Sequence, residues 1–253
     1  MKNLPLKIVA CLALAVACVL SSSFVSDNVS AQVKQAKPGD RLSPLERELL
    51  TEMNLARTQP AEYAAYLEQL KPFFKGNVYT PAGGRSFNTQ EGWAAVEEAI
   101  RFLRAAKPIA PFNVAEGMCY GAGELVKDQT KSGGTGHKGS DGSFCEQRLM
   151  RYGTWAAPVG ENLSYGRQSA RERVLELIID DGFSSRGHRL RIFNAGHKVA
   201  GISCGPHTSL GNVCVITMAG GFTARGPAQK AGASKPGASK TGEAPAPSGA
   251  VRF

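Results

Sequence analysis

Histidines are the side chains of this sequence best suited to acid–base or metal chemistry near neutral pH, because imidazole changes its charge in that range. The chain has four of them. Three, namely His137, His188 and His207, stand in glycine-containing contexts, where the backbone can turn and present a polar side chain. His137 precedes a turn at Ser140-Asp141-Gly142, and His188 follows a helix that we expect over residues 169–181. These histidines are the first candidates for a functional site.

The helix predicted over residues 169–181 carries a carboxylate on its apolar face. Asp181 follows Val174 and Ile178 at helical spacing, so the three side chains share one side of the helix. Asp181 and its neighbour Asp180 also stand at the helix C-terminus, where the helix dipole disfavours negative charge by roughly a few tenths of a kcal/mol or more. A carboxylate in this position needs a partner.

Two kinds of partner would satisfy Asp181. A histidine or a metal ion facing the carboxylate is the functional alternative. The structural alternative is a set of hydrogen bonds from backbone amides of residues 184–187, or an ion pair with Arg186 or Arg189. The sequence leaves both alternatives open.

A further acid begins a predicted strand, in the motif Gly160-Glu161-Asn162-Leu163. Together with His137 some two dozen residues earlier and Ser185-Arg186-Gly187-His188-Arg189 afterwards, this motif resembles the CAP superfamily. That superfamily, also called the SCP domain, comprises cysteine-rich secretory proteins, antigen five and plant pathogenesis-related proteins. Met53-Asn54-Leu55-Ala56-Arg57 and Pro60-Ala61-Glu62-Tyr63 resemble the first helix of its bacterial members, and the resemblance covers residues 45–222.

The resemblance implies a three-layer α-β-α sandwich with a central cleft that gathers two histidines and two acids. On this basis the histidines are His137 and His188, and the first acid is Glu161. Animal and plant relatives supply the second acid as a Glu from a Trp-containing helical segment, which this chain lacks. We therefore expect Asp181 as the substitute, Asp180 as the second choice and His207 as an additional member of the cleft.

Two imidazoles and one or two carboxylates suit a divalent metal ion, with zinc first and a harder cation as the alternative. His137 and His188 would be its ligands, and the ion could activate a bound water for hydrolysis. A second catalytic arrangement would join a histidine and Glu161 to Ser140 or Ser164. The sequence has no His-Glu-x-x-His helix and no Gly-x-Ser-x-Gly turn. Catalysis therefore stays open, and the balance favours a protein that is not an enzyme.

The N-terminus predicts export. Two lysines precede thirteen apolar residues, Ile8–Leu20, a stretch shorter than the roughly 20 residues that a bilayer-spanning helix needs. This pattern is typical of a secretory signal peptide, and small residues before Gln32 offer a cleavage point that would remove residues 1–31. The mature protein would be secreted or periplasmic. The alternative is a lipoprotein anchored to the membrane through Cys18.

An oxidising compartment allows disulfides among the four cysteines that remain after cleavage. Residues 199–204 and 212–218 are predicted strands of one hairpin, so Cys204 and Cys214 would face each other. Cys119 and Cys145 would then form the second bond. Buried free thiols are the alternative.

Much of the charge of the chain lies in its C-terminal tail. The formal net charge is +9, and residues 224–253 contribute five basic residues against one acidic residue. The tail repeats Gly-Ala-Ser-Lys and buries too little apolar surface to offset its ordering entropy, so we expect it to be disordered. It could make weak electrostatic contacts with anionic surfaces. Positive charge gathered in a tail does not indicate a nucleic-acid partner.

Helix signals come first and strand signals later, which predicts an α+β fold rather than alternating βαβ units. Helix starts, with a capping residue and a Glu three positions later, occur at Ser43, Asn113, Ser143 and Ser169. The two hairpin strands and a third strand at residues 161–165 would form a small antiparallel sheet. The stretch between positions 71 and 90, with its Gly and Pro residues, predicts a surface loop that borders a binding cleft.

These patterns divide the chain into a signal peptide (1–31), a linker (32–42), a CAP/SCP domain (43–223) and the tail (224–253). The resemblance implies a mostly non-catalytic family, many of whose members bind sterols, other lipids or protein partners. We therefore expect an exported binding module for a small apolar ligand or a cell-envelope component, with a His and acid cleft that binds a metal. The alternative function is a metal- or Ser-dependent hydrolase of peptides or esters.

Overall fold

The computed structural model describes residues 41–225. The chain divides into two units, Met1–Gln35 and Ala36–Phe253, and all described residues belong to the second. The predicted signal peptide, most of the linker and almost all of the basic tail lie outside the described residues, so what we expect of them stays a prediction. Within residues 41–225, no helix combines the length and the apolar character needed to cross a membrane.

A four-stranded sheet forms the middle layer of the described domain. The strands β5, β6 and β7 pair antiparallel, as predicted, whereas the short β4 adds a parallel pair at the edge of β6. The predicted strand at residues 161–165 is only the second part of β5. The strand order is β4-β6-β7-β5, with bounds Asn113–Val114, Val199–His207, Gly211–Ala224 and Gly153–Tyr165.

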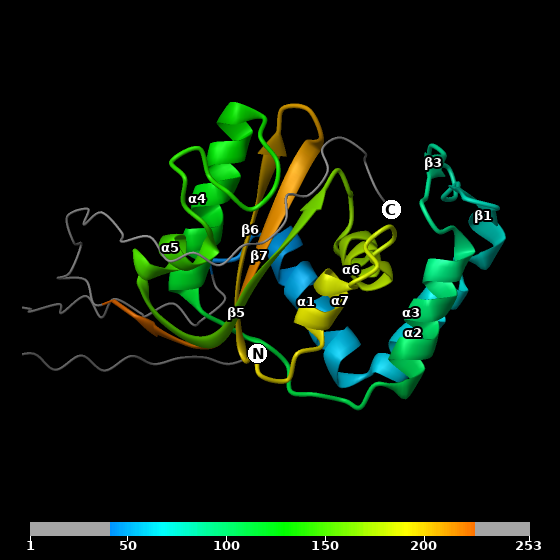
Figure 1. Cartoon of the computed structure of the whole chain (residues 1–253), viewed down its shortest axis with the longest axis horizontal. Coiled ribbons are helices and arrows are strands. Elements are labelled where there is room, and N and C mark those ends of the chain that lie inside the picture. Colours follow the sequence, from blue (N-terminus) through cyan, green and yellow to red (C-terminus); the bar gives the residue numbers. More distant parts are fainter. Residues whose placement is uncertain (1–40, 226–253) are drawn as a thin grey trace, which may run out of the picture. The chain divides into compact units, whose positions relative to one another are not determined.

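Helices cover both faces of this sheet (Figure 1). One face carries α4 (Glu116–Ser132) and α5 (Cys145–Met150), and the other carries α1 (Pro44–Thr58), α6 (Ala170–Ile179) and α7 (Gly187–Ile192). The predicted α+β fold class is therefore confirmed, with helices in two layers around the sheet.

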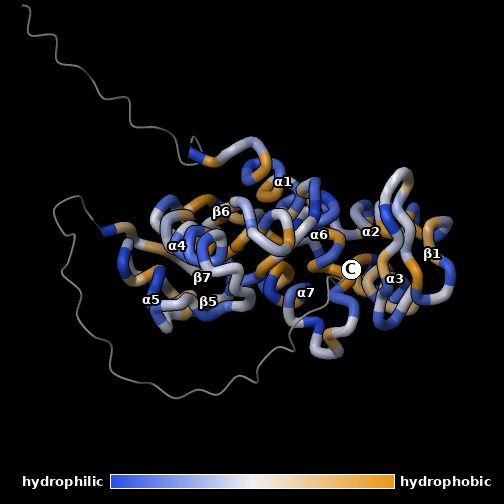
Figure 2. The backbone as a smooth tube through the Cα atoms, turned by 90° about the horizontal axis from the view of Figure 1, so that it is seen from above, coloured by the Kyte–Doolittle hydropathy of each residue, from blue (hydrophilic) through white to orange (hydrophobic). Residues whose placement is uncertain are grey.

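Strand β7 has apolar side chains that pack against the helices on both faces of the sheet. Val213 and Val215 pack in a cluster with residues of α4, whereas Ile216 and Met218 join the larger core with α1 and α6. This is the period-two alternation of a strand that is buried on both faces. Figure 2 shows that hydrophobic and hydrophilic residues alternate along the helices and strands of the domain.

Two of the four predicted helix starts are confirmed. Ser43 and Ser169 each accept a hydrogen bond from the backbone N–H of the Glu three residues later, and that Glu binds the N-cap amide in return. Each such cap stabilises its helix by about 1 kcal/mol.

The other two predicted starts, at Asn113 and Ser143, are wrong. Helix α4 begins after Ala115, because Asn113 belongs to β4 and pairs with Val199. Helix α5 begins after Phe144, because the Ser143 hydroxyl donates to Asp141 instead of capping. At Asn113 a distant strand displaces the local signal, whereas at Ser143 a competing local hydrogen bond does.

The segment between α2 (Pro60–Glu68) and α3 (Trp93–Ala105) holds a small sheet of its own, where the sequence predicts a loop. A single 3-10 turn leads into three two-residue strands that pair antiparallel in the order β1-β2-β3. Their bounds are Phe74–Lys75, Val78–Tyr79 and Phe87–Asn88. Strands this short leave little periodic pattern in the sequence, which explains why the sequence signal is only that of a loop.

One predicted disulfide is confirmed and the other is wrong. Cys204 and Cys214 are directly paired in the β6–β7 register and form a disulfide with an S–S distance of 1.99 Å. Cys119 and Cys145 are free. The Cys119 sulfur accepts a hydrogen bond from the Ile202 backbone N–H on β6, whereas Cys145 is buried on α5. Burial raises the pKa of both thiols, so both stay protonated at neutral pH.

Alkylation followed by peptide mass spectrometry tests this cysteine assignment. In denaturant without reductant, we expect Cys119 and Cys145 to be alkylated, and Cys204 and Cys214 to react only after reduction. In the folded protein both free thiols should react slowly, because the thiolate is the nucleophile and burial disfavours it. A cross-linked peptide joining Cys119 to Cys145 would contradict the assignment.

Candidate functional site

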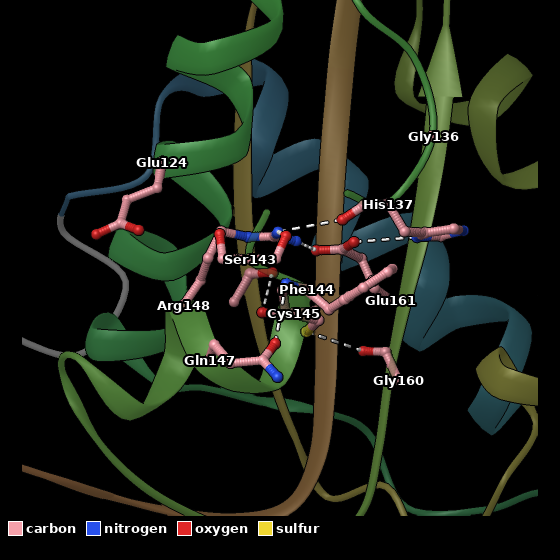
Figure 3. Close-up of polar contacts among 12 residues, drawn as sticks. Glu124, Gly136, His137, Ser143, Phe144, Cys145, Gln147, Arg148, Gly160 and Glu161 are labelled. Atoms are coloured by element: carbon pink, nitrogen blue, oxygen red, sulfur yellow. Dashed lines mark hydrogen bonds and ion pairs between the residues drawn. The ribbon is translucent and has the colours of Figure 1, made fainter. Parts of the chain in front are cut away.

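A buried carboxylate on β5 joins His137 to an arginine of α5 (Figure 3). One oxygen of Glu161 lies 3.0 Å from His137 Nδ1, and the other accepts a hydrogen bond of 2.7 Å from Arg148 Nη2. The Glu161 and Arg148 side chains are 3% and 2% exposed, whereas His137 is 38% exposed. The imidazole is therefore held from the interior and presented at the surface.

The loop that carries His137 is held by side chains of three neighbouring elements, α4, α5 and β5. Gly136 adopts a φ of +84°, a conformation that a larger residue rarely adopts. Its carbonyl accepts a hydrogen bond of 2.7 Å from Gln129 Nε2, and its N–H donates to the Tyr165 hydroxyl at 3.0 Å. Arg148 Nη1 adds a bond of 3.1 Å to the His137 carbonyl. The position of the imidazole follows from this network rather than from the local sequence.

His188 forms a second pair, with Asp180. Their side chains meet at 2.7 Å between Nδ1 and Oδ1, and the His188 backbone N–H donates to Asp180 Oδ2 at 2.9 Å. Asp180 is the C-cap of α6 and has a φ of +56° in the left-handed region. That turn directs its carboxylate towards the first turn of α7, where His188 lies.

The prediction that Asp181 is the second acid of the site is corrected by these contacts. Asp181 accepts hydrogen bonds from the backbone N–H groups of Gln90 and Glu91, at 2.7 and 2.8 Å. Helix α6 ends at Ile179, so the helical spacing that would place Asp181 beside Val174 does not extend to it. Backbone amides satisfy the carboxylate, as the structural alternative proposed, but they belong to a different segment from the one expected.

His207 does not join either pair. Its Nε2 donates to the Gly134 carbonyl at 2.8 Å, and its Nδ1 accepts from the backbone N–H groups of Ser209 and Leu210. Both ring nitrogens therefore bind the backbone of the β6–β7 turn and the neighbouring loop. His207 acts as a structural residue here, and its place in the predicted cleft is not supported.

The Glu161 side chain and the backbone of His188 lie on opposite faces of β5. Glu161 is paired in register with Thr217, whose hydroxyl donates to the Met118 carbonyl of α4, so Glu161 faces the α4 layer. The next residue, Asn162, points the other way and donates to the His188 carbonyl at 3.1 Å. The strand thus separates the Glu161 side chain from the backbone of His188.

This separation bears on the predicted zinc or harder cation. Among residues 41–225, no group of three or more His, Cys, Asp or Glu side chains could hold a metal ion. Each pair supplies one imidazole, whose Nδ1 faces a carboxylate and whose Nε2 would be the nitrogen for a metal ion. The described residues therefore form no group of this kind around the two histidines, the predicted zinc or harder cation stays a prediction, and no step of the proposed function passes through a metal.

The serines that the sequence offers as nucleophiles have carboxylate partners instead of histidines. The Ser140 hydroxyl donates to Asp128, and the Ser164 hydroxyl donates to Glu176 at 2.9 Å. A hydroxyl needs an adjacent base such as imidazole to act as a nucleophile at neutral pH. These contacts do not supply one.

A pocket lies apart from both histidine pairs and was not specified by any residue motif. It has a volume of about 240 Å³. On one side it is lined by the segment that carries β1–β3, and on the other by α6 and the connection between β5 and α6. Its apolar lining is Leu70, Tyr79, Pro81, Phe87 and Leu175. We call it the α6 pocket. The one sequence signal for it is the break between positions 71 and 90, which predicts a segment bordering a cleft.

Comparisons with known proteins give three similar structures. An outer surface protein of Borrelia burgdorferi aligns with 44% of this chain and 78% of its own, at 15% identity and a TM-score of 0.37. An extracellular protein of Bacillus anthracis that contains an SCP domain aligns with 60% of this chain and 43% of its own, at 14% identity and a TM-score of 0.35. A cysteine-rich secretory protein of Staphylococcus aureus aligns with 50% and 37%, at 15% identity and a TM-score of 0.30.

No family model matches this chain, and no curated protein matches it. The three structural similarities are low in identity and in TM-score, so they do not assign the chain to a family. The resemblance to the CAP superfamily therefore rests on the sequence motifs.

The pair of Arg148 and Glu161 makes a direct prediction about stability. We expect Arg148→Met to lower the free energy of unfolding by about 3–5 kcal/mol, because it leaves the Glu161 carboxylate buried without its cation. Arg151→Met is the matched control, since Arg151 is 44% exposed in its ion pairs and should contribute about 1 kcal/mol or less. Urea denaturation measures both values.

A second substitution separates the charge effect from a loss of packing. The double variant Arg148→Met, Glu161→Leu should recover part of the lost stability, because it also removes the uncompensated charge. Equal losses in the Arg148 and Arg151 single variants would show that the buried pair has no special role.

Proposed function

We propose that this protein is an exported binding module of the CAP type that holds a small apolar ligand in the α6 pocket. The N-terminal signal pattern and the motifs around His137, Glu161 and His188 support the export and the family. The alternative partner is a cell-envelope component, which the basic tail would contact. Residues 226–253 of that tail lie outside the described residues. The observation that carries the proposal is the composition of the pocket wall.

The pocket wall joins side chains that are distant in the sequence. Leu70, Tyr79 and Phe87 come from the segment after α2, and Leu175 comes from α6. Apolar and aromatic walls with a few polar groups are what small-molecule sites have in common. The volume of about 240 Å³ lies just below the roughly 300 Å³ at the lower end of such sites, so the ligand would be small.

Phe87 is the wall residue whose surroundings are best defined. The guanidinium of Arg167 lies over its ring, 5.1 Å from the ring centre, and Arg167 also pairs with Glu176 at 3.4 Å. Glu176 also accepts a hydrogen bond from the hydroxyl of Ser164, which is buried on β5. The aromatic wall is thus connected through an ion pair to the sheet, which makes a preformed pocket possible.

The histidine pairs support a binding role over catalysis. Glu161 has both oxygens engaged, by His137 and Arg148, and Asp180 has both engaged, by the ring and backbone of His188. A carboxylate at Nδ1 orients an imidazole, as in a catalytic triad, but hydrolysis would also need a nucleophile beside the ring, and the Ser140 and Ser164 hydroxyls bind other carboxylates. Within residues 41–225 the contacts that we describe favour no hydrolytic centre, so the hydrolase alternative is not proposed.

Binding of an uncharged probe tests the proposed function. We expect the purified protein to bind 1-octanol and the small uncharged dye 1-aminoanthracene, with octanol displacing the dye, as measured by fluorescence titration. Phe87→Ala should weaken binding about tenfold, because it removes one aromatic wall that the ligand would contact. Phe144→Ala is the matched control, since Phe144 is 46% exposed and does not line the pocket.

Two results would count against this function. If the protein binds neither probe, the pocket is not a ligand site. If Phe87→Ala and Phe144→Ala bind the probes equally well, the probes bind elsewhere on the protein.

A further inference from the structure

Four charged side chains line the α6 pocket, and they differ in whether another group of the protein already binds them. They are Arg85, Arg167, Glu172 and Glu176. Two cations and two anions would give no preference for the charge of a ligand if all four were equally available. The preference is therefore decided by which of them already has a partner.

Both glutamates are engaged within the protein. Glu172 accepts hydrogen bonds from the backbone N–H groups of Gln168 and Ser169, at 3.1 and 3.0 Å, and so forms part of the cap of α6. Glu176 accepts from the Ser164 hydroxyl at 2.9 Å and from Arg167 at 3.4 Å. Their carboxylates are directed to the start of α6 and to Ser164 and Arg167.

The two arginines differ from each other. Arg167 is 8% exposed, pairs with Glu176 and lies over the ring of Phe87. Arg85 is exposed at the rim, and in the described part of the chain it has no hydrogen bond or ion pair. It is the cation of this pocket that remains available to a ligand.

The turn that carries Arg85 is itself held in place. It connects β2 to β3, and the Thr80 and Ser86 hydroxyls at its two ends meet at 2.8 Å. The Gly84 N–H donates to the Pro81 carbonyl at 3.0 Å, which closes the turn just before Arg85. A cation at the rim of an apolar pocket, on a turn with internal hydrogen bonds, is a suitable receptor for the head group of an amphipathic anion.

We infer that the α6 pocket selects small carboxylates with an apolar body, and that Arg85 is the residue that determines this specificity. This inference rests on the proposed function. The planar guanidinium binds a carboxylate through two parallel N–H···O bonds, while the apolar part of the ligand contacts Phe87 and Leu175. A dianionic head such as a phosphate monoester fits less well, because among the described residues Arg85 is the one available cation of this pocket and carries a single positive charge.

Calorimetric titration with three eight-carbon probes tests this specificity. Octanoate, 1-octanol and octylamine share the same apolar body and differ in the charge of the head group. We expect octanoate to bind most tightly and octylamine most weakly. Arg85→Gln should weaken octanoate binding about threefold to fivefold, the effect of one exposed ion pair, and should leave octanol binding unchanged.

Two further variants keep the result unambiguous. Arg101→Gln removes an exposed arginine of α3 that does not line the pocket, and it should leave all three affinities unchanged. Arg85→Glu should reverse the order, so that octylamine binds more tightly than octanoate. The preference for octanoate should also fall as salt is added, because exposed charges are screened.

The outcomes separate this inference from the proposed function. If octanol binds but octanoate binds no better, or if octanoate binding does not change in Arg85→Gln, the charge specificity is overturned and the apolar pocket stands. If none of the three probes binds the unmodified protein, the proposed function itself is overturned.

Discussion

The buried carboxylate of Glu161 is the interaction on which the described architecture most depends. A carboxylate that is removed from water costs several kcal/mol unless cations and donors surround it. Here Arg148 reaches it from α5, and the same guanidinium holds the carbonyls of His137 and Ser143. Strand, helix and loop must therefore assemble together, and the partly exposed imidazole of His137 is a consequence of that assembly.

The end of α6 has the corresponding role on the other side of the sheet. Asp180 holds His188, while Asp181 holds the amides that precede α3. Arg186 adds ion pairs of 2.6 Å to both Glu91 and Glu98. These bonds attach the segment around β1–β3 to α6, and the α6 pocket exists because that segment is fixed there. The proposed ligand site thus depends on carboxylates that do not themselves line it.

Local sequence signals were sufficient where one element decides the outcome. The caps at Ser43 and Ser169, the β6–β7 hairpin and the Cys204–Cys214 disulfide all follow from residues that are neighbours in the chain or in one hairpin. The same signals predict the α+β class, because the order of helices and strands is itself a local property. The pairing of Cys119 with Cys145 is wrong because it assumed proximity that no local signal supports.

Only the tertiary structure decided which acid meets which histidine. Helical spacing favours Asp181, but a left-handed residue ends α6 one position earlier and brings Asp180 to His188 instead. The resemblance likewise groups His137 and Glu161 with His188, whereas in the structure each histidine faces a different carboxylate, His137 that of Glu161 and His188 that of Asp180. The sequence by itself determined the chemical types available and the order of the elements. The partner of each side chain was decided by where a helix ends and where the chain turns, since an offset of a single residue changes the direction in which a side chain points.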